Sequence, residues 1–280
     1  MKRVLLIDGS NLLFRMFYGI PNSIKNSKGK EIKGLIGFVG SIKKMYNELV
    51  PYSIIVIFDS ETSRQTNELI DSNYKNNRKD YTNIVEEENP FSQLPMIINA
   101  LDYLDIVNFE VEGNETDDYI ASVVSNKRFS DYEFIICSSD TDFIQLINNR
   151  TKLFVSRGKN SILYDSEKIF DKYQIYPEQY VEYKSLVGDS SDNIRGINKI
   201  GKVTASKILN EAKTINKFLL KSNNEKLKKI LEINMDLLNK NIKLISLNKE
   251  LCLYDLDIEK LDEYLLQKSV KEIIIEIGEN

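Results

Sequence analysis

Four short apolar runs, separated by longer amphipathic stretches, mark the first half of the 280-residue chain. Three of the four runs are continuous rather than alternating, and all are rich in β-branched residues, which is typical of parallel strands covered on both faces. They occupy residues 4–7, 54–58, 106–111 and 134–137. Amphipathic helices predicted over 35–49 and 116–124 lie between them. This order predicts an α/β fold with a mostly parallel central sheet and right-handed crossovers.

The pattern changes after the fourth run. Residues 151–155 and 162–164, joined by Arg157-Gly158-Lys159-Asn160, predict a β-hairpin. From about residue 166 the apolar spacing is mostly helical, and only 272–277 predicts a further strand. We therefore expect two lobes in one packed unit, an α/β domain over 1–180 and a helical lobe over 181–280.

Acidic residues follow every predicted strand of the first half. They are Asp8, then Asp59, then Glu115, Asp117 and Asp118, and finally Asp140 and Asp142. Because ligands bind at the carboxyl ends of strands in open α/β sheets, we expect these seven side chains to share one edge. Any single acid could equally cap a helix or face solvent. The whole set would repel itself strongly unless cations neutralised it, and two divalent cations held by such carboxylates build a phosphodiester-cleaving site.

Composition limits which metal ion the site could bind and which cellular compartment the protein would occupy. The chain has no histidine, which excludes histidine triads and histidine–zinc sites, so an oxygen-bound Mg²⁺ or Mn²⁺ is expected. Its two cysteines form no spaced pattern, and no apolar run reaches the roughly 20 residues of a spanning helix. A reduced cytoplasmic protein without a membrane partner is therefore expected. The net charge of −4 argues weakly against a nucleic-acid partner, so the distribution of charge matters more.

Basic residues concentrate in one part of the second half. Residues 184–221 hold eight Lys or Arg against three acids. Within them, the stretch Gly196-Ile197-Asn198-Lys199-Ile200-Gly201-Lys202 predicts a glycine hairpin that leads into a helix. Glycine lets backbone N–H groups approach a phosphate, and a helix N-terminus favours its charge. Lys199, Lys202 and Lys207 add the non-specific attraction expected of backbone binding.

Six motifs occur in a fixed order along the chain. They are Asp8-Gly-Ser-Asn-Leu-Leu-Phe-Arg15, Phe58-Asp59, Tyr74-Lys-Asn-Asn-Arg78, Glu115-Thr-Asp-Asp118, Ser139-Asp-Thr-Asp-Phe143 and Gly188-Asp-Ser-Ser-Asp-Asn-Ile194. In this combination the chain resembles the bacterial and phage 5′-nuclease family, which includes the 5′-3′ exonuclease domain of DNA polymerase I and the flap endonucleases. The resemblance covers residues 4–210 approximately. It implies a PIN-like domain in a stand-alone form, with a helical arch over about 62–95 and a helix–hairpin–helix over about 188–210.

The resemblance also implies the roles of individual residues. Two Mg²⁺ or Mn²⁺ ions per active site are expected. The first metal is assigned to Asp8, Asp59, Glu115, Asp117 and Asp118, and the second to Asp140, Asp142, Asp189 and Asp192. Catalysis is assigned to Asp117 and Asp118 together with Lys75 and Arg78, which would face the scissile phosphate.

DNA contacts and a monovalent cation follow from the same resemblance. The DNA-binding set is Arg15, Tyr74, Lys75, Arg78, Gly196, Lys199, Gly201, Lys202 and Lys207. Stacking of a base on Tyr74 would contribute roughly 1–3 kcal/mol, although a solvated helix face is the plain alternative for that stretch. The carbonyls of Ile197 and Ile200 are the expected potassium ligands, in a loop where Arg195 and Asn198-Lys199 depart from the family's usual proline and proline-glycine.

The expected function is hydrolysis of DNA at 5′ ends and 5′ flaps by two-metal-ion catalysis, as a 5′-3′ exonuclease and flap endonuclease. The expected partner is DNA with a 5′ flap, a 5′ overhang or a junction of single and double strands. We expect the protein to be a monomer, to be associated with the nucleoid, and to take part in DNA replication and repair. Two alternatives remain open at this point: a DNA-junction-binding protein with little catalysis, and a PIN-type ribonuclease.

Overall fold

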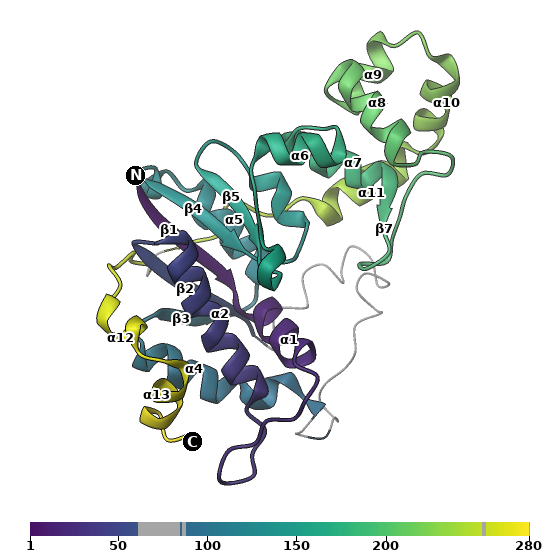
Figure 1. Cartoon of the computed structure of the whole chain (residues 1–280). Coiled ribbons are helices and arrows are strands. Elements are labelled where there is room, and N and C mark those ends of the chain that lie inside the picture. The colour runs from purple at the N-terminus through teal and green to yellow at the C-terminus, as the bar shows by residue number, and fades with distance from the viewer. Residues whose placement is uncertain (61–84, 86–87, 254–255, 280) are drawn as a thin grey trace.

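A six-stranded sheet forms the centre of the molecule (Figure 1). The structure is a computed structural model that describes residues 1–60, 85, 88–253 and 256–279. The strands are β1 (Lys2–Asp8), β2 (Ser53–Asp59), β3 (Val107–Val111), β4 (Tyr132–Cys137), β5 (Thr151–Val155) and β6 (Ile162–Tyr164). Their order is β3-β2-β1-β4-β5-β6, and neighbours are parallel except in the β5–β6 hairpin. The predicted mostly parallel sheet and the predicted hairpin are both confirmed.

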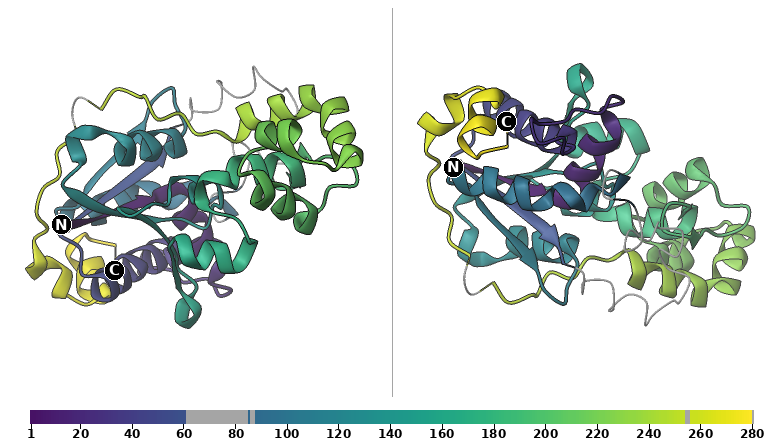
Figure 2. Two further views of the ribbon diagram at one scale, coloured as in Figure 1. Left: turned by 90° about the horizontal axis from the view of Figure 1, so that it is seen from above. Right: turned by 90° about the horizontal axis from the view of Figure 1, so that it is seen from below.

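The central strands β1, β2 and β4 are buried on both faces, as their continuous apolar runs predicted, whereas β3 at the edge of the sheet is only partly buried. Along β1, Val4 and Leu6 pack into one hydrophobic cluster, whereas Leu5 and Ile7 pack into another on the opposite face. The first face is covered by α5 (Thr116–Ser125), and the second by α1 (Gly9–Gly19), α2 (Lys33–Leu49) and α4 (Leu94–Tyr103). Figure 2 shows the sheet between these two layers.

Strand register brings the carboxyl ends of the strands to one edge. Asp8, the last residue of β1, lies opposite Ile57 of β2, and Asp59, the last residue of β2, lies opposite Val111 of β3. On the other side of β1, Ile7 pairs with Cys137 at the end of β4. The loops that follow these strands therefore start from neighbouring points.

A helical lobe follows the hairpin and lies beside that edge of the sheet (Figure 1). Its elements are α6 (Ser166–Tyr173), α7 (Tyr180–Val187), β7 (Gly188–Asp189), β8 (Ile194–Arg195), α8 (Lys202–Ala212), α9 (Ile215–Lys221), α10 (Glu225–Ile233) and α11 (Met235–Ile245). Two buried amides join them. Gln179 donates to the carbonyls of Leu209 and Lys213 at 2.9 and 3.0 Å, which fixes α8 to the start of α7. Asn241 of α11 donates to the carbonyls of Ser185 and Arg195 at 3.0 and 2.8 Å, so it holds α7 and the short β7–β8 pair together.

After α11 the chain returns to the α/β domain. The amide of Leu251 donates to Ser122 of α5 at 3.0 Å, and the amide of Leu261 donates to the carbonyl of Tyr52 at 3.0 Å. The last helices, α12 (Glu263–Gln267) and α13 (Val270–Glu276), pack beside α2 and α4 (Figure 2). The end of the 181–280 segment thus covers the sheet domain rather than the lobe.

The strand expected at 272–277 is wrong, because α13 is a helix. A capping box between Ser269 and Glu272 starts this helix, with the Glu272 amide donating to the Ser269 hydroxyl at 3.2 Å. Its apolar positions Val270, Ile273 and Ile274 face the α2 layer with helical spacing. Local isoleucine content favoured a strand, but the cap and this spacing decide the outcome. Among the described residues, no helix is long and apolar enough to cross a membrane.

The residue after α2 allows a prediction about stability. Val50 adopts a left-handed conformation with φ 45° and is 72% exposed, although a β-branched residue is disfavoured there. We expect Val50→Gly to stabilise the protein by about 0.5–1 kcal/mol, since it removes the left-handed strain at some cost in unfolded-state entropy. Thermal unfolding measures this. Val203→Gly, at an exposed valine within α8, is the control and should destabilise instead.

Candidate active site

Asp8 is the most enclosed acid at the carboxyl edge. It ends β1 and caps α1, where its carboxylate accepts the Asn11 amide at 3.0 Å and the Ser138 hydroxyl at 2.9 Å. Only 5% of Asp8 is exposed. Burial, with the charges of Asp59 and Asp140 adding to it, raises the pKa of Asp8 to about 7. An ionised carboxylate in this position therefore needs a positive partner.

Asp59 connects the end of β2 to the start of α5. Its amide donates to the Ser10 hydroxyl at 3.0 Å, and its carboxylate accepts the amide of Thr116 at 3.0 Å. Thr116 is the first residue of α5, directly after Glu115, and Asp117 and Asp118 lie in the first turn of that helix. The positive end of the helix dipole favours acids there. The structure thus brings the acids of the third strand loop next to Asp59.

The loop after β4 is organised by its own polar side chains. The Ser138 hydroxyl accepts the amide of Asp140 at 3.0 Å, and the carboxylate of Asp140 accepts the amide of Asp142 at 2.8 Å. Asn11 of α1 accepts both the amide and the hydroxyl of Ser139, at 3.1 and 2.8 Å. These bonds hold the β4 loop against the β1 loop and so place Asp140 near Asp8.

Ser138 and Asn11 are orienting residues that sequence reasoning did not assign. Ser138 joins Asp8 to the backbone of the β4 loop, and Asn11 joins α1 to that same loop. Their positions in the sequence could have indicated this role, because each is a small polar residue within three residues of a predicted metal ligand. Residues of this kind commonly fix the geometry of metal ligands.

A second acidic set surrounds a buried lysine. The Lys184 ammonium of α7 forms ion pairs with Asp142, with Asp189 at 2.6 Å and with Asp192 at 3.8 Å, and only 5% of its side chain is exposed. Burial and the neighbouring charge of Asp140 raise the pKa of Asp142 to about 7, and Lys184 opposes this shift. Burial also acts on Asp189, but hydrogen bonds from Lys184 and Ser191 leave its pKa lowered. Sequence reasoning counted Lys184 only among the basic residues of its stretch.

The two sets are distinct but adjacent, since the charge of Asp140 acts on both Asp8 and Asp142. Among the residues that the structure describes, no three Asp, Glu or Cys side chains lie close enough together to hold a metal ion as they stand. The donors nevertheless fit a hard cation. They are all oxygen atoms, the two most enclosed acids resist ionisation without positive charge, and the chain has no histidine. Mg²⁺ and Mn²⁺ suit such a site because they bind few carboxylates and keep waters.

The glycine hairpin lies between β8 and α8. A side chain at Gly196 would lie 2.2 Å from the Val187 carbonyl oxygen, so this glycine serves a close backbone crossing with Gly188, whose φ is +83°. Gly201 is different: it caps α8 without a side-chain hydrogen bond, and a side chain there would meet open space. Lys199, with φ 71°, forms the turn. The Ile197 carbonyl accepts the Ile200 amide at 3.0 Å.

The exposed basic side chains of this hairpin lie at its solvent side. Lys199, Lys202 and Lys207 are all exposed, as is the cap residue Gly201. A helix begins with N–H groups that have no intrahelical partner, and the first residues of α8 are exposed. This arrangement suits a phosphate backbone.

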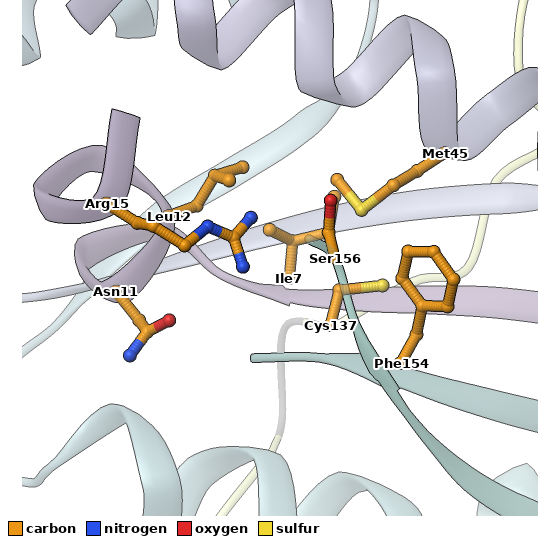
Figure 3. A pocket seen from close by; sticks show the side chains of 8 residues that line it. All are labelled: Ile7, Asn11, Leu12, Arg15, Met45, Cys137, Phe154 and Ser156. Carbon is orange, nitrogen blue, oxygen red and sulfur yellow. The ribbon is translucent and has the colours of Figure 1, made fainter. Parts of the chain in front are cut away.

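Arg15 reaches away from α1 toward the ends of β4 and β5 (Figure 3). Figure 3 shows its guanidinium between Asn11 and Ser156, in a crevice also lined by Ile7 and Cys137. Its Nε atom is buried without a hydrogen-bond partner among the described residues. The predicted arch residues Tyr74, Lys75 and Arg78 lie outside the described residues.

Comparison with known proteins identifies the family. The model of the 5′-3′ exonuclease N-terminal resolvase-like domain matches residues 3–174, and that of the 5′-3′ exonuclease C-terminal SAM fold matches residues 175–268. A 5′-3′ exonuclease of Buchnera aphidicola is 31% identical over 230 residues, which are 81% of this chain and 76% of that protein. DNA polymerase I of Bacillus subtilis is 32% identical over 220 residues, which are 78% of this chain but 24% of the polymerase.

The chain thus spans about a quarter of the length of its polymerase relatives. Among solved structures, a bacteriophage T5 flap endonuclease in a pseudo-enzyme–product complex with DNA and metal ions has the same fold, with a TM-score of 0.69 and 22% identity, and the match covers 100% of both chains. Both domain models and the Buchnera relative agree with the six sequence motifs. The chain belongs to the 5′-3′ exonuclease family.

Proposed function

We propose that the protein is a divalent-metal-dependent, structure-specific 5′-nuclease that hydrolyses DNA phosphodiester bonds at 5′ ends and 5′ flaps. The observation that carries this proposal is the grouping of acidic loops at the carboxyl edge of the sheet. There Asp8, Asp59, the first turn of α5 and the β4 loop are hydrogen-bonded into one constellation, and Lys184 joins the β4 loop to Asp189 and Asp192, just before the glycine hairpin in the chain.

The residues for two Mg²⁺ or Mn²⁺ ions are those that the sequence suggested. Asp8, Asp59, Glu115, Asp117 and Asp118 would hold one, and Asp140, Asp142, Asp189 and Asp192 would hold or approach the other. Bound divalent ions supply Lewis acidity at the phosphate and lower the pKa of water. The raised pKa of Asp8 supports this assignment, because a buried acid with acidic neighbours is stabilised in its ionised form by a cation.

The protein's own groups orient the reacting parts. Ser138 and Asn11 hold the β1 and β4 loops in register, which fixes the carboxylates before substrate binds. Lys75 and Arg78 remain the proposed contacts of the scissile phosphate and Tyr74 the proposed stacking partner, and Arg15 is a proposed DNA contact beside Asn11. The carbonyls of Ile197 and Ile200 remain the proposed potassium ligands.

Cleavage of a labelled DNA with a 5′ flap tests the proposal. With Mg²⁺ or Mn²⁺ the flap should be removed near the junction, and EDTA should abolish cutting. Binding of the flap without metal-dependent cutting would support the junction-binding alternative. Preference for single-stranded RNA over flap DNA would support the PIN-type ribonuclease. The same assay with blunt and 5′-overhang duplexes separates exonuclease from flap cutting.

The hairpin provides a prediction about DNA affinity. Lys202→Ala removes an exposed charge at the start of α8, so DNA binding should weaken by a similar factor for all sequences. The slope of log K against log salt should become shallower by about 1. Fluorescence anisotropy at several salt concentrations measures both quantities. Lys271→Ala, an exposed lysine of α13 with no proposed role, should leave affinity and slope unchanged.

A further inference from the structure

Lys184 has an unusual position for a lysine. Its side chain is buried, and its ammonium contacts three carboxylates that come from two separate segments. Asp142 belongs to the β4 loop of the α/β domain, Asp189 ends β7, and Asp192 lies in the turn between β7 and β8. Lys184 itself lies in the last turns of α7. One cation therefore connects the α/β domain to the hairpin of the helical lobe.

The charges at this contact show which group stabilises the others. Three carboxylates gather in a poorly hydrated place, and Lys184 supplies a positive charge that contacts all of them. Removing one partner of a buried ion pair is strongly destabilising, because it leaves charge uncompensated. Without Lys184 the three acids would repel one another and the loops that carry them would separate.

We propose that Lys184 is the resident counter-ion of the Asp142–Asp189–Asp192 set, which keeps the set assembled in the cation-free protein and competes with a divalent cation for the same carboxylates. This inference rests on the proposed function, because it uses the assignment of these acids to the second metal. A divalent cation at this set must bind carboxylates that Lys184 already contacts, and the two positive charges repel each other. Lys184 therefore lowers the set's affinity for that cation while supporting the fold.

Lys184→Met tests the proposal, since methionine keeps the length of the side chain and removes its charge. In EDTA, the melting temperature of the variant should fall by about 10 °C relative to the wild type. Mg²⁺ should restore most of this loss, so the Mg²⁺-dependent rise in melting temperature should be much larger in the variant. Calorimetric titration with Mn²⁺ should show the weaker of the two binding events tightened by about tenfold or more.

Matched variants isolate the effect. Lys152→Met removes another ion-paired lysine, 3.1 Å from Glu133 and away from the edge, and should neither lower the melting temperature by more than a few degrees nor change its dependence on Mg²⁺. Lys184→Arg keeps the charge and should behave like the wild type in Mn²⁺ titration. If Lys184→Met does not fold in EDTA, the double variant Lys184→Met with Asp189→Asn should recover folding, because it removes one uncompensated acid.

The melting and titration results test the role of Lys184 independently of DNA cleavage. A Lys184→Met protein that melts like the wild type in EDTA, or that binds the weaker Mn²⁺ ion with equal or lower affinity, would overturn the proposal. So would failure of the double variant to recover any stability. If wild-type protein does not cut flap DNA, the proposed nuclease function fails, but the melting and titration results still show whether Lys184 and a divalent cation share the set.

Discussion

Asp8→Asn is expected to abolish DNA cleavage while leaving the fold intact. Asp8 lies where β1 ends, accepts hydrogen bonds from Asn11 and Ser138, and faces the charges of Asp59 and Asp140. Asparagine keeps the shape and can still cap α1, but its neutral amide is a poor ligand for a hard divalent cation. We expect the single-turnover cleavage rate to fall by about 10³-fold or more, which corresponds to about 4 kcal/mol of lost transition-state stabilisation.

The control for this substitution is another helix-capping aspartate. Asp165 caps α6 by accepting the Lys168 amide at 3.0 Å, in the same way that Asp8 accepts the Asn11 amide. Asp165→Asn should therefore cut flap DNA at the wild-type rate. The melting temperature of Asp8→Asn in EDTA should equal or exceed that of the wild type, since one of several repelling charges has been removed. Wild-type cleavage by Asp8→Asn would show that this edge of the sheet is not the active site.

Gly196→Ala is expected to cause a large loss of stability. A side chain there would lie 2.2 Å from the Val187 carbonyl oxygen and 2.8 Å from the Gly188 amide nitrogen, and these are backbone atoms that cannot rotate away. The two chains must separate, which we expect to lower the free energy of unfolding by about 3 kcal/mol and the melting temperature by about 10 °C. Because Asp189 and Asp192 lie between these glycines, cleavage should also fall.

Gly201→Ala is the matched substitution within the same hairpin. A side chain at Gly201 meets open space, so the loss of stability should stay below about 1 kcal/mol. Its methyl group would stand in front of the first amides of α8, so DNA affinity should fall even though the fold is kept. Equal losses of stability in the two variants would show that the hairpin backbone does not cross as described.

The sequence predicted the sheet and the acids at its edge because each signal is local. A continuous apolar run such as 54–58 indicates a doubly buried strand, and Asp59 follows it directly. Parallel pairing then places such residues at one edge whatever the details of the loops. The helix at 270–276 was misassigned because three consecutive isoleucines outweighed the cap formed by Ser269 and Glu272.

The role of Lys184 could not be predicted in this way. In the sequence it is one lysine in a helix next to Glu182, and nothing nearby distinguishes it from a solvated side chain. Its partner Asp142 is 42 residues away. Similarly, Asn241 is an ordinary polar residue of α11 until tertiary packing places it against Ser185 and Arg195. Long-range contacts of single polar side chains have no periodic signature that a sequence can display.

The return of the chain after α11 makes the helical lobe an insertion within the α/β domain. The polypeptide leaves the sheet domain once, after β6, and re-enters it where the Leu247 and Asn248 amides donate to Gln145 and Asp118, at 3.1 and 2.7 Å. A lobe joined by two crossings cannot swivel about a single covalent link. For the proposed nuclease, the spacing along a duplex between the backbone bound by the hairpin and the bond held at the carboxylates would therefore be set by the protein, and with it the position of the cut.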